Sequence, residues 1–125
     1  MRYTLLLHYP EATEHSIGTE AVEEAQRAFA SYAGALRQAG VLISAEVLQP
    51  SSSSTTLTMV DGTLRVQDGP FADTKEQLGG TFVIHVPHLD AAIDWARQAP
   101  SISWGAVEIR PGATHVVAGV WTPNS

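Results

Sequence analysis

Apolar residues recur along this chain with two different spacings, one typical of helices and the other of strands. The helical spacing occupies residues 20–40 and again 89–98. Four stretches rich in aliphatic and aromatic residues end at turn-forming residues, which is typical of strands: 2–9, 41–48, 79–87 and 104–111. The polar stretch 11–19 is predicted to be irregular. The predicted order is therefore strand, helix, strand, then an insertion, then strand, helix, strand.

Turn-forming residues predict how several of these elements begin and end. Thr19 is expected to cap the start of the first helix, and Gly40 is expected to end it. The dipeptide Asp61-Gly62 separates two alternating segments and predicts a two-residue type I′ hairpin turn, because both central residues of that turn need a positive φ. The serine run 51–54 is predicted to be a loop. Gly79-Gly80 is predicted to allow a bulge or a close approach of two backbones.

The order of elements predicts an α+β fold of the ferredoxin-like type, a split βαβ antiparallel sheet with two helices on one face and a hairpin insert. Residues 1–111 make up this single domain, and residues 112–125 form a C-terminal extension. Within the extension, 114–121 alternates as a strand does. We expect it to form an extra edge strand, added to the sheet of the same chain or to that of a partner.

Side chains on a strand alternate between the two faces of a sheet, so that parity separates the residues beneath the helices from those on the opposite face. The set beneath the helices is apolar: Tyr3, Leu5, Leu7, Val41, Ile43, Ala45, Val47, Phe82, Ile84, Val86, Val107 and Ile109. The opposite face mixes polar with aliphatic residues: His8, Ser44, Glu46, His85, Glu108 and Arg110 among Leu6, Leu42 and Val83. A half-buried cavity closed by a second subunit accounts for this mixture. The pattern therefore predicts a homodimer in which two sheets face each other.

Composition excludes several classes of partner and site. The 7 Lys and Arg against 13 Asp and Glu give a formal net charge of −6, which argues against nucleic-acid binding. The chain has no Cys, hence no disulfide, no thiolate metal site and no Cys nucleophile. No apolar run approaches the ~20 residues that cross a bilayer, and the start MRYTLLLHYPE lacks the apolar region of a signal peptide. We therefore expect a soluble cytoplasmic protein that binds neither nucleic acid nor membrane.

One stretch in the middle of the chain resembles a family signature. The string DGPFADTKEQLGG, from Asp68 to Gly80, is similar to the motif of the DGPF, or YCII-related, family of small dimeric α+β barrel proteins. The start MRYTLLLHYPE, the segment AGVLISAEVLQP and the ending VEIRP follow in the order and at the spacing of this family. The resemblance covers residues 1–111. It implies a ferredoxin-like dimeric barrel with an active-site cleft.

The same resemblance bears on function. The wider family includes small dehydrohalogenase-like and lyase-like enzymes of aromatic degradation, and DGPF proteins often accompany extracytoplasmic-function sigma factors, which makes a sigma factor a candidate partner. Part of that family is credited with a His–Asp pair whose His lies on the first helix. This chain has Phe29 at that place, so that only the acid, Asp68 or Asp73, carries over.

His8 and His85 are the sharpest candidates for chemistry on the mixed face. Neighbouring strands lie ~4.8 Å apart, so that the two imidazoles are able to meet across the sheet. Either both are structural residues with satisfied hydrogen bonds, or they transfer protons, for which imidazole is suited by its unperturbed pKa near ~6.5. With Glu46 or Glu108 they would offer ligands to a divalent metal. Their spacing matches no recognised metal signature, and we assign neither a metal nor a cofactor.

The polar stretch 68–80 separates two predicted strands, and loops of that length are often functional. We expect it to cover the mouth of the cavity, with Phe71 anchored in the core. Asp68 at its base has two interpretations. It either makes turn hydrogen bonds with its own backbone, beside the rigid Pro70, or it aims a carboxylate at a bound molecule.

Two classes of function fit these residues. The first is a cofactor-free enzyme of the lyase or isomerase type, in which His8 or His85 moves a proton and Asp68 or Glu46 orients the imidazole. The groups expected to contact a small-molecule substrate are Glu46, Asp73, Glu108 and Arg110. Arg110 would hold an anionic group of that substrate, or else pair with Glu108. The second class is a non-catalytic accessory or regulatory protein, whose cavity senses a metabolite or whose surface meets a sigma factor.

Overall fold

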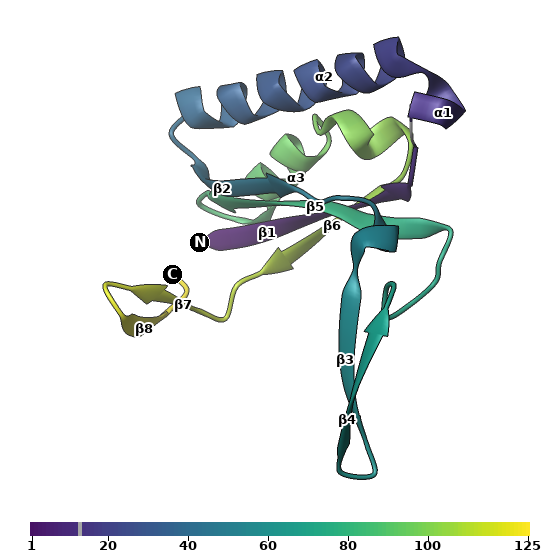
Figure 1. Ribbon diagram of the computed structural model, residues 1–125. Coiled ribbons are helices and arrows are strands. Elements are labelled where there is room, and N and C mark those ends of the chain that lie inside the picture. The colour runs from purple at the N-terminus through teal and green to yellow at the C-terminus, as the bar shows by residue number, and fades with distance from the viewer. Residues whose placement is uncertain (13) are drawn as a thin grey trace.

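A four-stranded antiparallel sheet forms the centre of the computed structural model, which describes residues 1–12 and 14–125, with only the backbone of 14 and 15 (Figure 1). The strands are β1 (Arg2–Pro10), β2 (Leu42–Val47), β5 (Glu76–His85) and β6 (Ala106–Pro111). They lie in the order β2-β5-β1-β6, and every neighbouring pair is antiparallel. This is the predicted ferredoxin-like α+β sheet, in which the first and third core strands occupy the centre.

Two helices, α2 (Thr19–Gln38) and α3 (Leu89–Ala96), cover one face of the sheet (Figure 1). Between them and the sheet lie the fully buried side chains of the core: Leu5, Leu7, Leu36, Phe82 and Ile84. The Tyr32 hydroxyl of α2 donates a hydrogen bond of 2.7 Å to the Trp95 carbonyl of α3, which joins the two helices. No helix among the described residues is long and apolar enough to cross a membrane.

Three short helical segments lie outside this frame. The stretch 11–19, expected to be irregular, contains the four-residue helix α1 (Glu14–Ile17), so that expectation is wrong. Two 3-10 helices, η1 (Ser51–Ser53) and η2 (Pro100–Ser103), fall in the connections after β2 and α3. The serine run is thus a tight turn inside a loop.

The two ends of α2 differ from each other in how well the sequence predicts them. Gly18, with φ of 90°, takes the N-cap position and Thr19 is already helical, so the predicted Thr19 cap is wrong. The cause is α1, which ends one residue earlier and leaves a single hinge residue between two helices. At the other end Gly40 has φ of 76°, and the Val41 amide bonds to the Leu36 carbonyl at 3.1 Å. This is a Schellman ending, and it confirms the prediction for Gly40.

A bulge in β5 confirms the close backbone approach predicted at the Gly pair. Leu7 pairs with Gly80 and His8 pairs with Leu78, so Gly79 is the extra residue. A Cβ on Gly79 would lie under 3.0 Å from the ring of Tyr9, where only a hydrogen atom fits. The Tyr9 ring therefore rests directly on the backbone of the bulge.

A second bulge, in β2, changes the face on which several residues lie. Leu42 pairs with Ile84, a buried core residue, while Ser44 pairs with Val83 on the opposite face. Ile43 is the bulged residue and is 44% exposed. The predicted parity is therefore wrong for Leu42, which faces the core, and for Ile43, which leaves it. A one-residue irregularity is enough to reverse side-chain direction in a strand.

The insertion between β2 and β5 is a hairpin of β3 (Thr55–Val60) and β4 (Thr63–Asp68) that projects from the sheet on the side away from the helices (Figure 1). Asp61 and Gly62 have φ of 50° and 79°, as the predicted type I′ turn requires. Because β5 begins at Glu76 rather than at residue 79, the following loop is 69–75 and is shorter than expected.

One face of the β3–β4 hairpin is apolar and open to solvent. Leu57 pairs with Val66 and Met59 pairs with Leu64, so that the four side chains share one face. Their exposed fractions lie between 56% and 67%. The opposite face carries polar pairs such as Thr56 with Gln67. We call the four-residue surface of Leu57, Met59, Leu64 and Val66 the arm face.

The C-terminal segment folds as a hairpin of its own, β7 (Thr114–Val117) and β8 (Val120–Pro123). Positive φ at Ala118 and Gly119 reverses the chain, so a single added strand over 114–121 is a wrong prediction. Among the described residues this hairpin makes no ladder with the central sheet. Its end is tied to β1 by Asn124, whose Oδ1 accepts from the Arg2 amide at 2.7 Å and whose Nδ2 donates to the Arg2 carbonyl at 3.0 Å. Pairing across a dimer stays a prediction.

We expect Gly105→Ala to lower the free energy of unfolding by about 1–3 kcal/mol, the range of an overpacked site. A Cβ at Gly105 would lie 2.8 Å from Cα of Tyr9 and closer still to the His8 carbonyl oxygen. Gly34→Ala is the control, because Gly34 lies in α2 with open space around it and Ala favours a helix by about 0.5–1 kcal/mol. Urea unfolding measures both variants. Equal stability of the two would contradict the close approach of β1 and β6.

Candidate functional site

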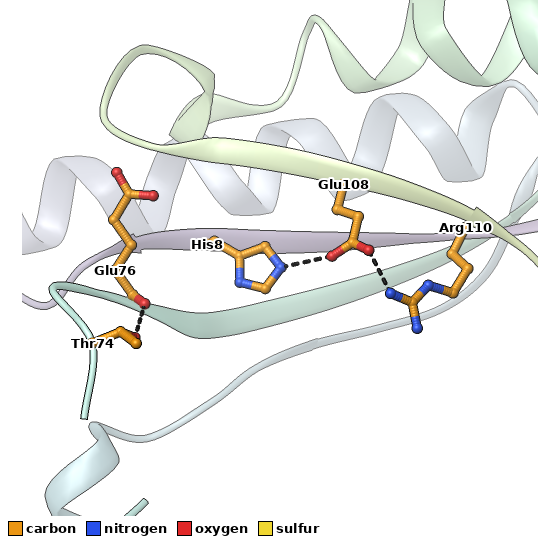
Figure 2. A network of polar contacts seen from close by, with 5 residues as sticks. All are labelled: His8, Thr74, Glu76, Glu108 and Arg110. Carbon is orange, nitrogen blue, oxygen red and sulfur yellow. Dashed lines mark hydrogen bonds and ion pairs between the residues drawn. The ribbon is translucent and has the colours of Figure 1, made fainter. Parts of the chain in front are cut away.

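The sheet face opposite the helices, which we call the open face, brings three charged or titratable side chains into a row. His8 comes from β1, and Glu108 and Arg110 come from neighbouring positions on the same face of β6. His8 Nε2 lies 3.1 Å from Glu108 Oε1, and Arg110 Nη2 donates to Glu108 Oε2 at 2.5 Å. Figure 2 shows the carboxylate between the imidazole and the guanidinium. The expected pairing of Glu108 with Arg110 is confirmed, and His8 joins it.

The charge of Glu108 determines what His8 is able to do. Hydrogen bonds from Arg110 and then from His8, together with the charge of Arg110, lower the pKa of the Glu108 carboxyl. An ionised carboxylate only accepts hydrogen bonds, so it holds the Nε2–H form of neutral His8. The other ring nitrogen, Nδ1, makes no hydrogen bond within the described part of the chain. His8 therefore presents Nδ1 as a free base or acceptor.

His8 forms one wall of a pocket of about 650 Å³. The facing walls come from the serine run with the start of β3, and from Pro70, Phe71 and Ala72 of the loop 69–75. The end of β5 adds Glu76, Gln77 and Leu78. The loop 69–75 thus borders the same hollow as the His8 imidazole.

Hydrogen bonds to backbone groups hold this loop in place. The Gly69 backbone amide donates to the Ser54 carbonyl at 2.8 Å, and the Thr56 hydroxyl donates to the Gly69 carbonyl at 2.7 Å. The side-chain Nε2 of Gln77 donates to the carbonyls of Ala72 and Thr74 at 3.0 and 3.1 Å. The Thr74 hydroxyl donates to the Glu76 carbonyl at 2.5 Å (Figure 2). The loop is therefore a fixed wall whose anchoring does not involve the carboxylate of Asp68.

Phe71 does not lie in the core, so the expectation that it anchors the loop is wrong. Its exposed fraction is 78%, and its ring forms part of the pocket rim. The core beneath is already filled by Phe82 and the aliphatic residues around it. Since the hydrogen bonds of Gln77 and Thr56 fix the loop, its position does not depend on burial of the Phe71 ring.

The serine run is a part of the site that sequence reasoning missed. Ser51, Ser53 and Ser54 line the pocket. Ser51 is held by Glu11, whose carboxylate accepts from the Ser51 amide at 2.6 Å and from the Ser51 hydroxyl. In the sequence, the only indication of this wall was the run of four hydroxyl groups, 51–54, directly after Pro50. The contact with Glu11, 40 residues away, was not visible in the sequence pattern.

His85 lies far from His8, and the expected meeting of the two imidazoles is wrong. The register pairs His85 with Arg2, six residues before His8 in β1, which at ~3.3 Å per residue separates them by roughly 20 Å. His85 Nε2 instead lies 3.3 Å from the Met1 amine. The alternation of side chains in β1 and β5 was predicted correctly. The register between these two strands, which depends on where the pairing begins, was not predicted from the sequence.

The three remaining candidates do not meet His8 in a shared pocket. Glu46 lies on β2 opposite Thr81, and Asp68 lies at the end of β4 opposite Thr55. Asp73 lies in the loop 69–75. All three are exposed, and none of them lines the pocket or forms an ion pair with a described residue. Nowhere in the described part of the chain do three or more His, Asp or Glu side chains gather as a metal site would need.

Comparison with known proteins identifies a matching family and a relative of this chain. The model of the YCII-related domain matches residues 1–112. An uncharacterised protein of Rhizobium meliloti (strain 1021) is 34% identical to this chain over 117 residues, which is 92% of this chain and 94% of that protein. The similarity therefore extends over nearly the whole length of both.

We expect Arg110→Gln to raise the pKa of the Glu108 carboxyl toward its ordinary value of 4.5, because Arg110 is the main cause of its lowering. A lowered folded-state pKa means that ionised Glu108 stabilises the fold above its ordinary pKa, and that this contribution is lost as the pH falls through the lowered value. Carboxyl-carbon NMR titration measures the midpoint. Arg65→Gln, on the β3–β4 hairpin, is the control that should leave the midpoint unchanged. An unchanged midpoint in Arg110→Gln would contradict the ion pair.

Proposed function

Because the chain belongs to the family of YCII-related domains, we propose that it is a small-molecule-binding protein whose site is the pocket beside His8. We further propose that it catalyses cofactor-free proton transfer of the lyase or isomerase type there. The observation that carries this proposal is the row of His8, Glu108 and Arg110 at the wall of that pocket. An imidazole oriented by a carboxylate is a recurrent general base.

Each member of the row has a definite role in this proposal. Nδ1 of His8 removes a proton from a carbon next to a carbonyl group. It then returns the proton to another atom of the same molecule, in an isomerisation, or to a leaving group, in an elimination. Glu108 holds the ring in the Nε2–H tautomer and stabilises the imidazolium that forms. Arg110 keeps Glu108 ionised and positioned.

The walls of the pocket favour an uncharged polar ligand. Hydroxyl and amide groups of the serine run, Thr74 and Gln77 surround the hollow, and its lining contains no Lys or Arg. Arg110 is bound to Glu108 and lies outside that lining. We therefore assign Arg110 to the row rather than to an anionic group of the substrate. A hydroxy-ketone or a lactone matches these groups better than a carboxylate does. Asp73, in the loop that borders the pocket, stays a candidate contact.

The second candidate function is that of a non-catalytic accessory protein, which binds the same class of ligand and passes the signal to a protein such as an extracytoplasmic-function sigma factor. The exposed arm face favours this alternative, because large exposed apolar patches commonly mark protein contacts. The two functions differ in one measurable respect. Only the enzyme moves protons of the bound molecule.

We expect the protein to accelerate exchange of the carbon-bound protons of dihydroxyacetone in D₂O, followed by proton NMR. His8→Asn should slow the exchange at least tenfold, a modest share of the 10²–10⁴ that a general base contributes. Glu108→Gln should slow it less, because the imidazole remains. His85→Gln is the matched control, since His85 of β5 pairs with Arg2 at the opposite end of β1 from His8. Binding without exchange would favour the accessory role. The absence of both binding and exchange would overturn the proposed site.

We also propose that the protein is a homodimer. The open face carries Leu6 and Val83, which are half-buried, and the four side chains of the arm face are largely exposed. A monomer rarely leaves an apolar surface such as the arm face uncovered. In a two-fold assembly each copy contributes its arm and receives that of its partner. The arm faces of both copies are then buried by the same contact. A second copy would therefore cover the arm face, whereas the accessory role would leave that face to another protein.

We expect Met59→Lys to shift the protein from dimer to monomer, because it places a charge in the centre of the arm face. Gln67→Lys adds the same charge to the polar face of the same hairpin and should leave the dimer intact. Sedimentation velocity at micromolar concentration distinguishes the states. A wild-type particle of 13.4 kDa would overturn the dimer. A Met59→Lys dimer would remove the arm face from the interface.

A further inference from the structure

A second hollow, of about 800 Å³, opens on the helix side of the sheet where β1 ends. It lies between α2 and the ends of β1 and β2, and we call it the groove. His8 and Tyr9 are consecutive in β1, so they point to opposite faces, His8 into the polar pocket and Tyr9 into the groove. The two hollows share a rim that includes Leu48 and Leu78.

The groove is apolar and has an aromatic floor. The Tyr9 and Trp104 rings meet edge to face at 5.8 Å, and the Phe29 and Trp104 rings do so at 6.1 Å. Trp104 remains 44% exposed, although its neighbours surround it. Ring pairs in this arrangement present both faces and edges to a further ring. The floor is thus complementary to a flat aromatic molecule.

Three alanines belong to the α2 wall of the groove. Ala21, Ala25 and Ala28 face the groove, while Ala30 lies on the exposed side of the same helix. With larger residues at these positions the hollow would be filled by the protein itself. Its volume falls within the range of ~300–1,000 Å³ that is typical of small-molecule sites.

One polar group lies on this floor without a partner. The Tyr9 hydroxyl makes no hydrogen bond to any described residue, and its ring rests on the backbone of Gly79. The phenol of Tyr9 is protonated at neutral pH, and burial, and next the nearby Glu11 carboxylate, raise its pKa further above the ordinary value of 10.0. Its hydroxyl is therefore available as a hydrogen-bond donor to a molecule in the groove.

The charges of the lining exclude one class of ligand. The carboxylates of Glu11 and Glu24 belong to the groove, and none of the described residues that line it is a Lys, Arg or His. An anion would meet repulsion from these carboxylates that no described side chain of the lining offsets. A neutral molecule meets none.

We propose that the groove is a second binding site, for a small uncharged aromatic molecule that carries a hydrogen-bond acceptor for the Tyr9 hydroxyl. It is separate from the site of proton transfer, since neither His8 nor Glu108 lines it. Aromatic ketones and aromatic esters belong to this chemical class.

Two fluorescent probes with the same body test the charge requirement. N-phenyl-1-naphthylamine is neutral, and 8-anilino-1-naphthalenesulfonate adds a sulfonate to the same rings. We expect the neutral probe to bind the wild-type protein at least tenfold more tightly. Equal affinities, or a preference for the sulfonate, would overturn the proposal.

A pair of variants locates the probe. Ala25→Phe fills the groove and should weaken binding of the neutral probe at least tenfold, whereas Ala30→Phe makes the same change on the exposed side of α2 and should not. Circular dichroism checks that both variants fold. Should Ala25→Phe fail to fold, the two-probe comparison on the wild-type protein still decides. Equal binding by two folded variants would overturn the groove as the site, and so would a change of oligomeric state in Ala25→Phe, which would assign the groove to a second copy.

A third comparison tests Tyr9 and separates this site from the proton-transfer pocket. 2-Acetylnaphthalene should displace the neutral probe at lower concentration than 2-ethylnaphthalene does, and Tyr9→Phe should remove that difference. If the two compounds compete equally in the wild-type protein, the role of Tyr9 is overturned. His8→Asn should leave probe binding unchanged. Failure of the proposed function would therefore leave the second binding site standing, and failure of the second binding site would leave the proposed function standing.

Discussion

The structure depends on a close approach of three strands at the end of β1, where only glycine fits beside the chain. On one side Gly105 brings the start of β6 against the backbone of His8 and Tyr9, and on the other the bulge at Gly79 lies under the Tyr9 ring. Close pairing with β6 places Glu108 on the same face as His8 and within hydrogen-bonding distance of it. The bulge gives the Tyr9 ring a flat backbone to rest on. Two adjacent residues therefore acquire opposite environments, one polar and one apolar.

Electrostatics distinguish these two environments further. The open face combines a cation, a carboxylate and an imidazole, so that the carboxylate is charged and the imidazole has a fixed tautomer. The described lining of the groove has carboxylates and no Lys or Arg, and burial raises the pKa of its phenol, Tyr9. Glu11 connects the two, because it adds to the effect of burial in raising the pKa of Tyr9 on one side and holds Ser51 of the polar pocket on the other. A single carboxylate thus shapes both hollows.

Features that depend on neighbouring residues could be predicted from the sequence, and those that depend on register could not. The type I′ turn at Asp61-Gly62 and the Gly40 helix end follow from backbone preferences of single residues. The bulge at Ile43 reversed the assigned faces of β2, and the register of β1 with β5 placed His85 far from His8. Both follow from which residues pair between strands distant in sequence. Alternation alone leaves that choice open.

The candidate site shows the same division. The open-face positions of His8, Glu108 and Arg110 followed from parity alone, because the register between the described strands β1 and β6 contains no bulge. The exposure of Phe71 depended instead on how the core fills, and Ser51 depended on a contact with Glu11. Neither is encoded in a local pattern.

The pocket and the arm face are joined through one short segment, β3, which would couple the proposed ligand binding to the proposed dimer. Thr56 lies in β3, one residue before Leu57 of the arm face; it lines the pocket and holds the loop 69–75 through its bond to Gly69. A copy seated on the arm face would restrain the strand from which Thr56 projects. A ligand in the pocket would restrain the same strand from the other face. If each contact favours the same position of β3, each strengthens the other by an equal free energy, since such coupling is reciprocal. Ligand affinity in this fold is then a property of the assembled pair and not of one chain.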